Sequence, residues 1–209
     1  METSEFESSV MENKARVFHV NKRKKINDFV NSKILSTSIE DGEWFGNGMY
    51  FWDNKPNCMF WIRNRKYKEN KIDYKVVQSS IEYDDSDIID FTNDDDVVYF
   101  EKLEKIIASD LNLTDAEIIQ MGKELGYSIN VCLENMEQMP SGAPSLIKGF
   151  AHYPSTPKIY QFSKKHFALT KYNHRALPTR DIKVIYCVKD KKVLNFNDTD
   201  IIDLEEREV

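Results

Sequence analysis

Several features that would define a membrane or secreted protein are missing from this sequence. No apolar run approaches 18 residues, which excludes a membrane-spanning helix. The first 14 residues are acidic and lack an apolar core, so they do not read as a secretory signal. The three cysteines, Cys58, Cys132 and Cys187, are odd in number and far apart, which argues against a disulfide scaffold and favours a reducing compartment. We therefore expect a cytoplasmic protein that does not contact a membrane.

Metal-binding patterns are also missing. There are only four histidines, and none is spaced from another as His-x-His or His-x-x-x-His. The acidic stretch 84–96 has no EF-hand pattern, so it is interpreted as a solvated loop. No metal site is predicted.

What the chain does contain is enough apolar material for one folded domain. It has 209 residues, of which 41% are hydrophobic and 12% aromatic, and this composition excludes a wholly disordered protein. The net charge of −6 is uneven, because residues 1–12 carry −4, residues 84–96 carry −7 and residues 200–209 carry −4. The remaining residues therefore carry +9. A basic body of this kind is compatible with a nucleic acid, a dinucleotide or an acidic partner.

Hydrophobic periodicity predicts an α+β domain in which helices are inserted between strands. Strands are predicted at 15–20, 49–52, 74–83, 158–162 and 182–188, and helices at 22–35, from Asn54 onward, at 97–108, from Thr114 to a stop at Gly126, and at 128–136. Residues 139–157 hold four of the six prolines and are predicted to form a long loop. The organisation expected is a flexible lead-in at 1–13, a single domain at 14–198 and an acidic tail at 199–209.

Local signals support two of these helices in detail. Thr114-x-x-Glu117 is a capping box, and Ile118, Met121 and Leu125 follow at helical spacing. For the helix 97–108, the aspartates 94–96 are expected to act as caps. Its apolar face is expected to comprise Tyr99, Phe100, Leu103, Ile106 and Ile107.

The most unusual segment is Trp44-Phe-Gly-Asn-Gly-Met-Tyr-Phe-Trp52, which holds five aromatics in nine residues, interrupted by two glycines. One interpretation is a turn anchored by core aromatics. The other is an aromatic wall for a planar ring, with glycines that let the backbone approach a ligand. The segment alone does not decide between them. His19, in the predicted first strand, is by itself more typical of a hydrogen-bonded structural residue.

Taken together, these two segments resemble a known family. A strand with His19, a helix, and then Trp44-Phe-Gly-Asn-Gly-Met-Tyr-Phe-Trp-Asp-Asn54 is similar to the ADP-ribosyltransferases of the poly(ADP-ribose)-polymerase-like class, the diphtheria-toxin-type or His-Tyr-Glu class. The likeness continues through Ile89-Asp-Phe-Thr92 and Ile185-Tyr-Cys-Val-Lys-Asp190. It is specific at 44–54, weaker at 15–35 and 182–190, and poor at 97–180.

The resemblance implies a split β-sandwich with inserted helices that binds NAD as its substrate. It implies transfer of ADP-ribose to a macromolecular acceptor, either protein or nucleic acid, with release of nicotinamide. His19 would bond the adenosine ribose, the backbone of Val20 would hold the nicotinamide amide, and Tyr50 would stack on the nicotinamide ring. The remaining NAD-binding residues implied are Asn21, Trp44, Gly48 and Phe51. Proteins of this kind are often toxins or factors in phage–host conflict, with an antitoxin or a host target as partner.

Two parts of the sequence depart from the family pattern, the residues after His19 and the start of the last core strand. Val20 and Asn21 stand where glycine and threonine are usual, which narrows the space expected for nicotinamide. The third catalytic residue, usually a glutamate, should open the last core strand, and the register that aligns Ile185 with it supplies an aliphatic side chain instead. A looser register offers Asp181 as the acid, although Asp181 also reads as a turn residue.

Further candidates and rivals stay open. Arg16 is expected to reach the same cleft as His19, and the basic clusters 63–68 and 158–183 are either acceptor or pyrophosphate contacts or plain solvated surface. Rival functions are an NAD glycohydrolase, an RNA 2′-phosphotransferase and a catalytically degenerate scaffold that binds a partner. Only Arg16 and Arg23 lie near the histidine, which disfavours the phosphotransferase.

Overall fold

The computed structural model describes residues 13–39, 44–66, 73–137, 142–152 and 182–202. The strands are β1 (Asn13–Lys22), β2 (Met49–Trp52), β3 (Tyr74–Tyr83), β4 (Ile88–Asp90), β5 (Leu146–His152), β6 (Ile182–Val188) and β7 (Leu194–Ile202). The helices are α1 (Arg23–Ser32), α2 (Lys55–Lys66), α3 (Asp94–Asp110), α4 (Asp115–Lys123), α5 (Leu125–Met136) and the 3-10 turn η1 (Lys191–Val193). The predicted α+β class is confirmed.

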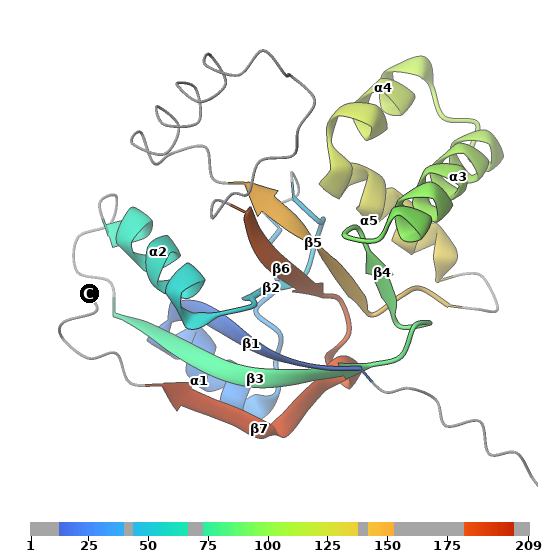
Figure 1. Ribbon diagram of the computed structural model, residues 1–209. Helices are drawn as coiled ribbons and strands as arrows, with labels where there is room; N and C mark the ends of the chain where they lie inside the picture. The colour runs from blue at the N-terminus through green and yellow to red at the C-terminus, as the bar shows by residue number, and fades with distance from the viewer. Residues whose placement is uncertain (1–12, 40–43, 67–72, 138–141, 153–181, 203–209) are drawn as a thin grey trace, which may run out of the picture.

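The seven strands form one mixed sheet in the order β4-β5-β6-β2-β1-β3-β7 (Figure 1). β1 pairs with β3 along ten consecutive residues, and β2 pairs with β6 along its whole length. Between β1 and β2, however, the described residues form a single register pair, Phe18 with Trp52. The sheet therefore consists of two halves, β4-β5-β6-β2 and β1-β3-β7, that meet at one point and separate on either side of it.

Helices cover both faces of the sheet, α1 on one face and α2, α3 and α5 on the other. α1 contacts β1, β3 and β7, and its Ile26 and Phe29 are fully buried in a core cluster with Val17, Phe51 and Val77. α2 contacts β1 and β2 on the opposite face, where Cys58 and Ile62 join a second cluster. α3 and α5 extend this second cluster over β4 and β5, as Figure 1 shows at the right of the molecule. None of the described helices is long and apolar enough to cross a membrane.

Several local predictions are confirmed. The strands at 49–52, 74–83 and 182–188 have the expected bounds. Asn54 caps α2, since its side-chain oxygen accepts a hydrogen bond from the Asn57 N–H at 3.0 Å. The capping box at Thr114 and Glu117 is complete, with both reciprocal hydrogen bonds present at the start of α4.

Helix ends were less well predicted. α1 stops at Ser32, because Lys33 turns into the left-handed conformation with φ of 54°, and Ile34 is left 59% exposed. Gly126 does not terminate α4, which ends at Lys123; it lies inside α5, where its carbonyl is close to Gly46.

The start and the apolar face of α3 also differ from the prediction. Asn93 is its N-cap, and the three aspartates occupy the first turn, where they still complement the helix dipole. Phe100, Leu103 and Ile107 are buried as expected, but Tyr99 and Ile106 are exposed, because the helix is covered along a narrower stripe than its sequence suggests.

Two predictions about the end of the chain were wrong. The predicted loop 139–157 contains β5, whose Leu146 and Ile147 are fully buried between β4 and β6. The strand is held by seven register pairs with β6 and by an ion pair of 2.6 Å from Lys148 to Asp90. The predicted tail 199–209 begins inside β7, where Thr199 is hydrogen-bonded to Ser79 at 2.7 Å. The predicted strand 158–162 lies outside the described residues.

We expect Phe29→Ala to lower the free energy of unfolding by about 3–5 kcal/mol, because it empties a fully buried site against Phe51 and Phe196. Ile34→Ala, one residue beyond the left-handed Lys33, should change it by no more than about 0.5 kcal/mol. Urea unfolding of the two variants measures both values. Equal losses would show that α1 continues through Ile34, contrary to the structure.

Candidate functional site

The two segments singled out in the sequence meet where β1 and β2 join. His19 lies one residue past the pair formed by Phe18 and Trp52, and its Nδ1 is 2.7 Å from the carbonyl oxygen of Tyr50. Its ring also packs at 5.4 Å from that of Phe51, with a tilt of 50°. Residues separated by 31 positions in the chain are therefore in direct contact, and the contact lies at the edge of the split in the sheet.

His19 is held in a neutral state. Its side chain is only 7% exposed, and burial, together with the positive charge of Lys25, lowers its pKa to about 4, although the bond to Tyr50 opposes this. A carbonyl oxygen can only accept, so Nδ1 must carry the proton of the neutral ring. Nε2 is then an acceptor, and it points to the amide of Asn21 at 3.5 Å.

Asn21 and Val20 extend this site along β1. The Asn21 amide donates to the Ser36 hydroxyl at 3.1 Å, which links the end of β1 to the segment after α1. Val20 is buried in the cluster on the α2 side of the sheet. Beyond Phe18, the described part of β1 makes no register pair with β2, so this edge of the strand is not used in pairing within the sheet.

Tyr50 is anchored by the turn that precedes it. Its hydroxyl donates to the Gly46 carbonyl at 2.5 Å and accepts the N–H of Phe45 at 3.1 Å. The ring is buried and meets Trp44 edge-on at 5.8 Å. These contacts support the first of the two interpretations, a turn anchored by core aromatics, and they also fix the orientation of the Tyr50 ring.

Lys189 fixes the same turn from the other side, a role that the sequence did not suggest. Its ammonium donates to the carbonyls of Phe45 and Asn47, each at 2.6 Å. Burial lowers the pKa of Lys189, but contacts with Cys187 oppose that shift. The turn is thus tied to the residue directly after β6, which is why an isolated turn motif could not reveal it.

The two glycines of the aromatic segment are required by packing within the protein. A Cβ on Gly48 would lie 2.4 Å from Cys187 Sγ and 2.9 Å from the Val188 carbonyl. Gly46 has a φ of +73°, and a Cβ there would lie 2.8 Å from the Gly126 carbonyl of α5. The glycines were expected to let the backbone come close to a ligand. In the structure they let it come close to β6 and α5 instead.

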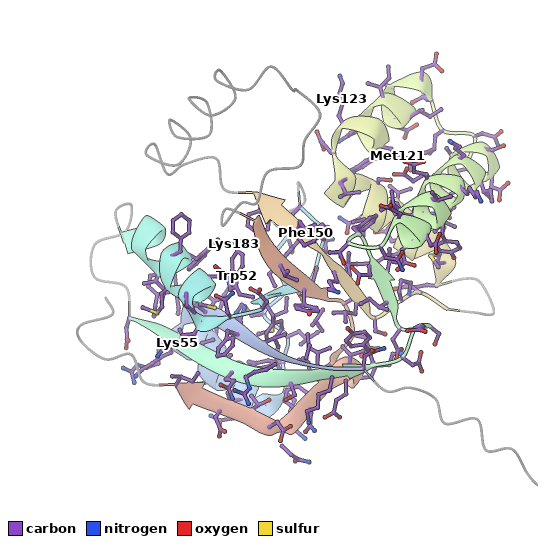
Figure 2. The ribbon with its side chains drawn as sticks, in the orientation of Figure 1. Trp52, Lys55, Met121, Lys123, Phe150 and Lys183 are labelled. Carbon is purple, nitrogen blue, oxygen red and sulfur yellow. The ribbon has the colours of Figure 1, made fainter. Side chains whose placement is uncertain are left out.

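The other aromatic candidates belong to the core. Phe51 is fully buried against His19 and Phe29 on the α1 side. Trp52 is buried on the opposite face beside α2, as Figure 2 shows, and Trp44 packs against it at 6.1 Å. Alternate residues of β2 therefore serve the two faces of the sheet.

Ile185 does not occupy the position predicted for it. β6 opens at Ile182, and Ile185 is its fourth residue, fully buried opposite Trp52 and Gly149. β6 is also not the last strand, because β7 follows it. The register that assigned Ile185 to the opening of the last core strand was therefore wrong. Asp181 lies outside the described residues.

Arg16 is not brought to His19. It is three positions earlier on β1, so its side chain leaves the opposite face of the strand, and it is exposed. The cluster 158–183 is almost wholly outside the described residues, as are the side chains of Arg63 to Lys68. The expectation that Arg16 shares a cleft with His19 is not supported.

One carboxylate that the sequence analysis left without a role lies at the opening of β6. The N–H of Asp53 donates to the Val184 carbonyl at 3.3 Å, and its Oδ1 accepts hydrogen bonds from Asn54 and Asn57 at 2.8 and 2.7 Å. The side chain is half-buried. Its position directly after Trp52 was the available signal, since Asp53 lies inside the segment 44–54 that resembles the family.

Cysteine and metal chemistry have little support in this region. Cys58, Cys132 and Cys187 are all free and buried. Burial raises the pKa of Cys58 strongly and that of Cys132 to about 12, so neither thiol forms a nucleophilic thiolate near neutral pH. In the part of the chain that the structure describes, no three His, Cys, Asp or Glu side chains gather as metal ligands.

Comparison with known proteins yields one distant relative. The chain is 24% identical over 186 residues to an uncharacterized protein of Methanocaldococcus jannaschii, MJ0359, and the alignment covers 85% of this chain and 83% of that protein. No family model matches the chain. No solved structure matches it either.

We expect Gly48→Ala to destabilise the protein by about 1–3 kcal/mol, because the new methyl group collides with Cys187 and the β6 backbone. Gly122→Ala is the matched control: it lies in α4 with no atom within 4 Å of the added Cβ, and it should stabilise by about 0.5–1 kcal/mol. Thermal unfolding of the two variants tests the difference in sign. A neutral Gly48→Ala would show that β6 is not packed against this turn.

The buried neutral state of His19 predicts a pH dependence of stability. The unfolded chain titrates near 6.5 and the folded one near 4, so the unfolded state binds more protons between these values. The contribution of neutral His19 to the free energy of unfolding is fully present above pH 6.5. It is lost as the pH falls toward 4, which lowers that free energy by no more than about 3 kcal/mol. His19→Gln should remove this part of the slope in urea unfolding from pH 7.5 to 4.5. Identical slopes in the two proteins would contradict a buried neutral His19.

Proposed function

We propose that this protein is an NAD-dependent ADP-ribosyltransferase that modifies a macromolecular acceptor. The observation that carries the proposal is the contact between His19 and Tyr50, at 2.7 Å, at the point where the two halves of the sheet separate. The sequence resemblance assigns NAD binding to these two residues. In the structure they are neighbours although they are 31 positions apart in the chain.

The split of the sheet supports the finer fold assignment, an ADP-ribosyltransferase-like split β-sandwich. Two half-sheets joined through one register pair leave the edge of β1 beyond Phe18 unpaired toward β2. Backbone groups along such an edge are suited to bind an amide, which is the role proposed for Val20. Helices α3 to α5 are inserted between β4 and β5, away from this edge.

The state of His19 suits the role proposed for it. With Nδ1–H donated to Tyr50, Nε2 is the acceptor of the ring, and a ribose hydroxyl would donate its hydrogen bond there in place of the Asn21 amide, which lies 3.5 Å away. The Tyr50 ring, fixed by the Phe45–Gly46 turn, supplies a flat apolar surface for the nicotinamide ring. Cleavage of the glycosidic bond develops positive charge on the ribose, so positioning and charge stabilisation would supply most of the rate.

The acid of the proposed site is Asp53 or Asp181. Ile185 carries no acid and is buried in an apolar cluster, so it takes no part in proton transfer. Asp53 is a described carboxylate beside Val184, the third residue of β6, and its Oδ1 is oriented by two amide groups. A carboxylate there would bond a ribose hydroxyl and activate the acceptor.

A catalytically degenerate scaffold that binds a partner is the second candidate. It is favoured by the aliphatic Ile185 in the middle of β6 and by the Tyr50 hydroxyl, which is occupied by the turn. In that case NAD would not be consumed, and the aromatic segment would serve only the core.

Nicotinamide release decides between these candidates. We expect the purified protein with cell extract to release nicotinamide from NAD, and His19→Ala to lower the rate at least about 100-fold through misplacement of the substrate. Asp53→Asn tests the acid and should lower kcat with little change in KM. Asp87→Asn, a half-buried carboxylate paired with Lys192 as Asp53 is paired with its amides, is the matched control and should retain full activity.

Labelled NAD then separates transfer from hydrolysis. A labelled macromolecule identifies a transferase, and digestion with protease or nuclease assigns the acceptor class. Nicotinamide release without a labelled product would instead establish an NAD glycohydrolase. Absence of both nicotinamide release and NAD binding by calorimetry would refute the enzyme and leave the binding scaffold.

A further inference from the structure

A compact basic surface lies directly beside the candidate site. Lys22 ends β1, and Arg23, Lys24 and Lys25 begin α1, so four consecutive cations occupy the junction. All four side chains are exposed. We call these four residues the β1–α1 basic surface. The net charge of the whole chain is −6, so this concentration of positive charge runs against the overall balance.

Most of this positive charge has no ion-pair partner among the residues that the structure describes. Arg23 forms an ion pair with Asp73. Lys22, Lys24 and Lys25 have no ion-pair partner among the described residues, whereas Lys14, on the same strand, pairs with Glu82 and Asp198 at 2.7 Å each. Three neighbouring uncompensated ammonium groups are therefore available to an anionic partner.

Helix stability does not explain this arrangement. Cations at the start of a helix oppose its dipole, and the first turn of α1 contains no acidic residue to offset them. Lys22 is the N-cap and makes no side-chain capping hydrogen bond. By contrast, α3 and α4 carry acidic residues in their first turns and have side-chain caps. The local sequence thus retains charges that are unfavourable for the isolated helix.

The β1–α1 basic surface continues directly from the site. Asn21, which hydrogen-bonds Ser36 and lies 3.5 Å from His19 Nε2, immediately precedes Lys22. The charge of Lys25 is close enough to lower the pKa of His19. A chain of phosphates lying on the surface would therefore pass the end of β1, where His19 and Val20 are proposed to hold NAD.

We propose that the β1–α1 basic surface binds the phosphodiester backbone of a nucleic acid, which is the acceptor of ADP-ribose. This inference rests on the proposed function. In the transfer, the bond from the ribose C1 to nicotinamide breaks and nicotinamide leaves with the bonding electrons. An oxygen or nitrogen of the nucleic acid forms the new bond to C1 and releases one proton to solvent.

The alternative source of phosphate is the pyrophosphate of NAD itself. It carries two phosphates, whereas four cations follow one another here and all are solvent-exposed. A solvated surface next to the site, rather than within it, suits a long polyanion that lies across the protein.

Oligonucleotide binding without NAD tests the surface by itself. Fluorescence anisotropy with fluorescein-labelled 12-nucleotide dT and U strands, at 50 and 200 mM NaCl, gives the affinity and its salt dependence. The test variant is Lys22→Gln/Lys24→Gln/Lys25→Gln. The matched control is Lys102→Gln/Lys105→Gln/Lys123→Gln, which removes three exposed lysines from α3 and α4, among them Lys123 (Figure 2).

We expect the test variant to bind the oligonucleotides at least about 10-fold more weakly at 50 mM NaCl. The slope of log K against log salt, which is negative, should become shallower by about 2, because three phosphate contacts are lost. The control should bind as the wild type does. The control should keep its melting temperature, and that of the test variant should not fall, since the substitutions are exposed, remove no ion pair recorded in the structure and take unfavourable positive charge from the start of α1.

Three results would overturn the inference. The first is that the wild-type protein binds no oligonucleotide. The second is that the test and control substitutions weaken oligonucleotide binding equally. The third is that the test variant has a raised KM for NAD while its oligonucleotide binding is unchanged. The last would assign the lysines to the dinucleotide. Because binding is measured without NAD, it stays separate from the proposed function, whose failure would appear as absent nicotinamide release.

Discussion

The structure depends on a single contact between two strands, the register pair of Phe18 with Trp52. Each strand is otherwise committed to its own half-sheet, β1 to β3 and β2 to β6. If β1 and β2 paired along their whole length, the sheet would be continuous, and the backbone N–H and C=O groups of β1 after Phe18 would be hydrogen-bonded to β2. Because they separate there, His19 uses its ring nitrogen, rather than its backbone, to bind Tyr50.

The aromatic segment 44–52 is compatible with both interpretations drawn from the sequence, a turn anchored by core aromatics and an aromatic wall for a planar ring. Tyr50, Lys189 and the two glycines show that the turn is fixed by packing. The same contacts hold the Tyr50 ring in one orientation on the α2 side of the sheet, while the backbone carbonyl of Tyr50 binds His19. A fixed ring is what a site for a planar ligand requires. An anchored turn is therefore compatible with a binding role, and rigidity is the property that links the two interpretations.

Local signals in the sequence were sufficient for much of the fold. Alternation identified β3, and the capping box identified α4, because both are determined by neighbouring residues. β5 was missed because its Gly149 and flanking prolines resemble a loop, and its stability comes from β4 and β6. Ile185 was misplaced for the same reason, since position within a strand is set by pairing with Trp52 and not by local pattern. Lys189 is invisible locally because its partners lie more than 140 residues away.

The order in which the elements occur along the chain has a consequence for biosynthesis. His19 and Tyr50 are made early, but the turn beside Tyr50 is supported by Cys187 and Lys189, and β2 has no long partner before β6. A nascent chain that has not yet emerged to residue 189 lacks the contacts that orient the aromatic ring. The turn that orients Tyr50 is thus completed only near the end of synthesis, so fragments released early carry the motif residues without the geometry.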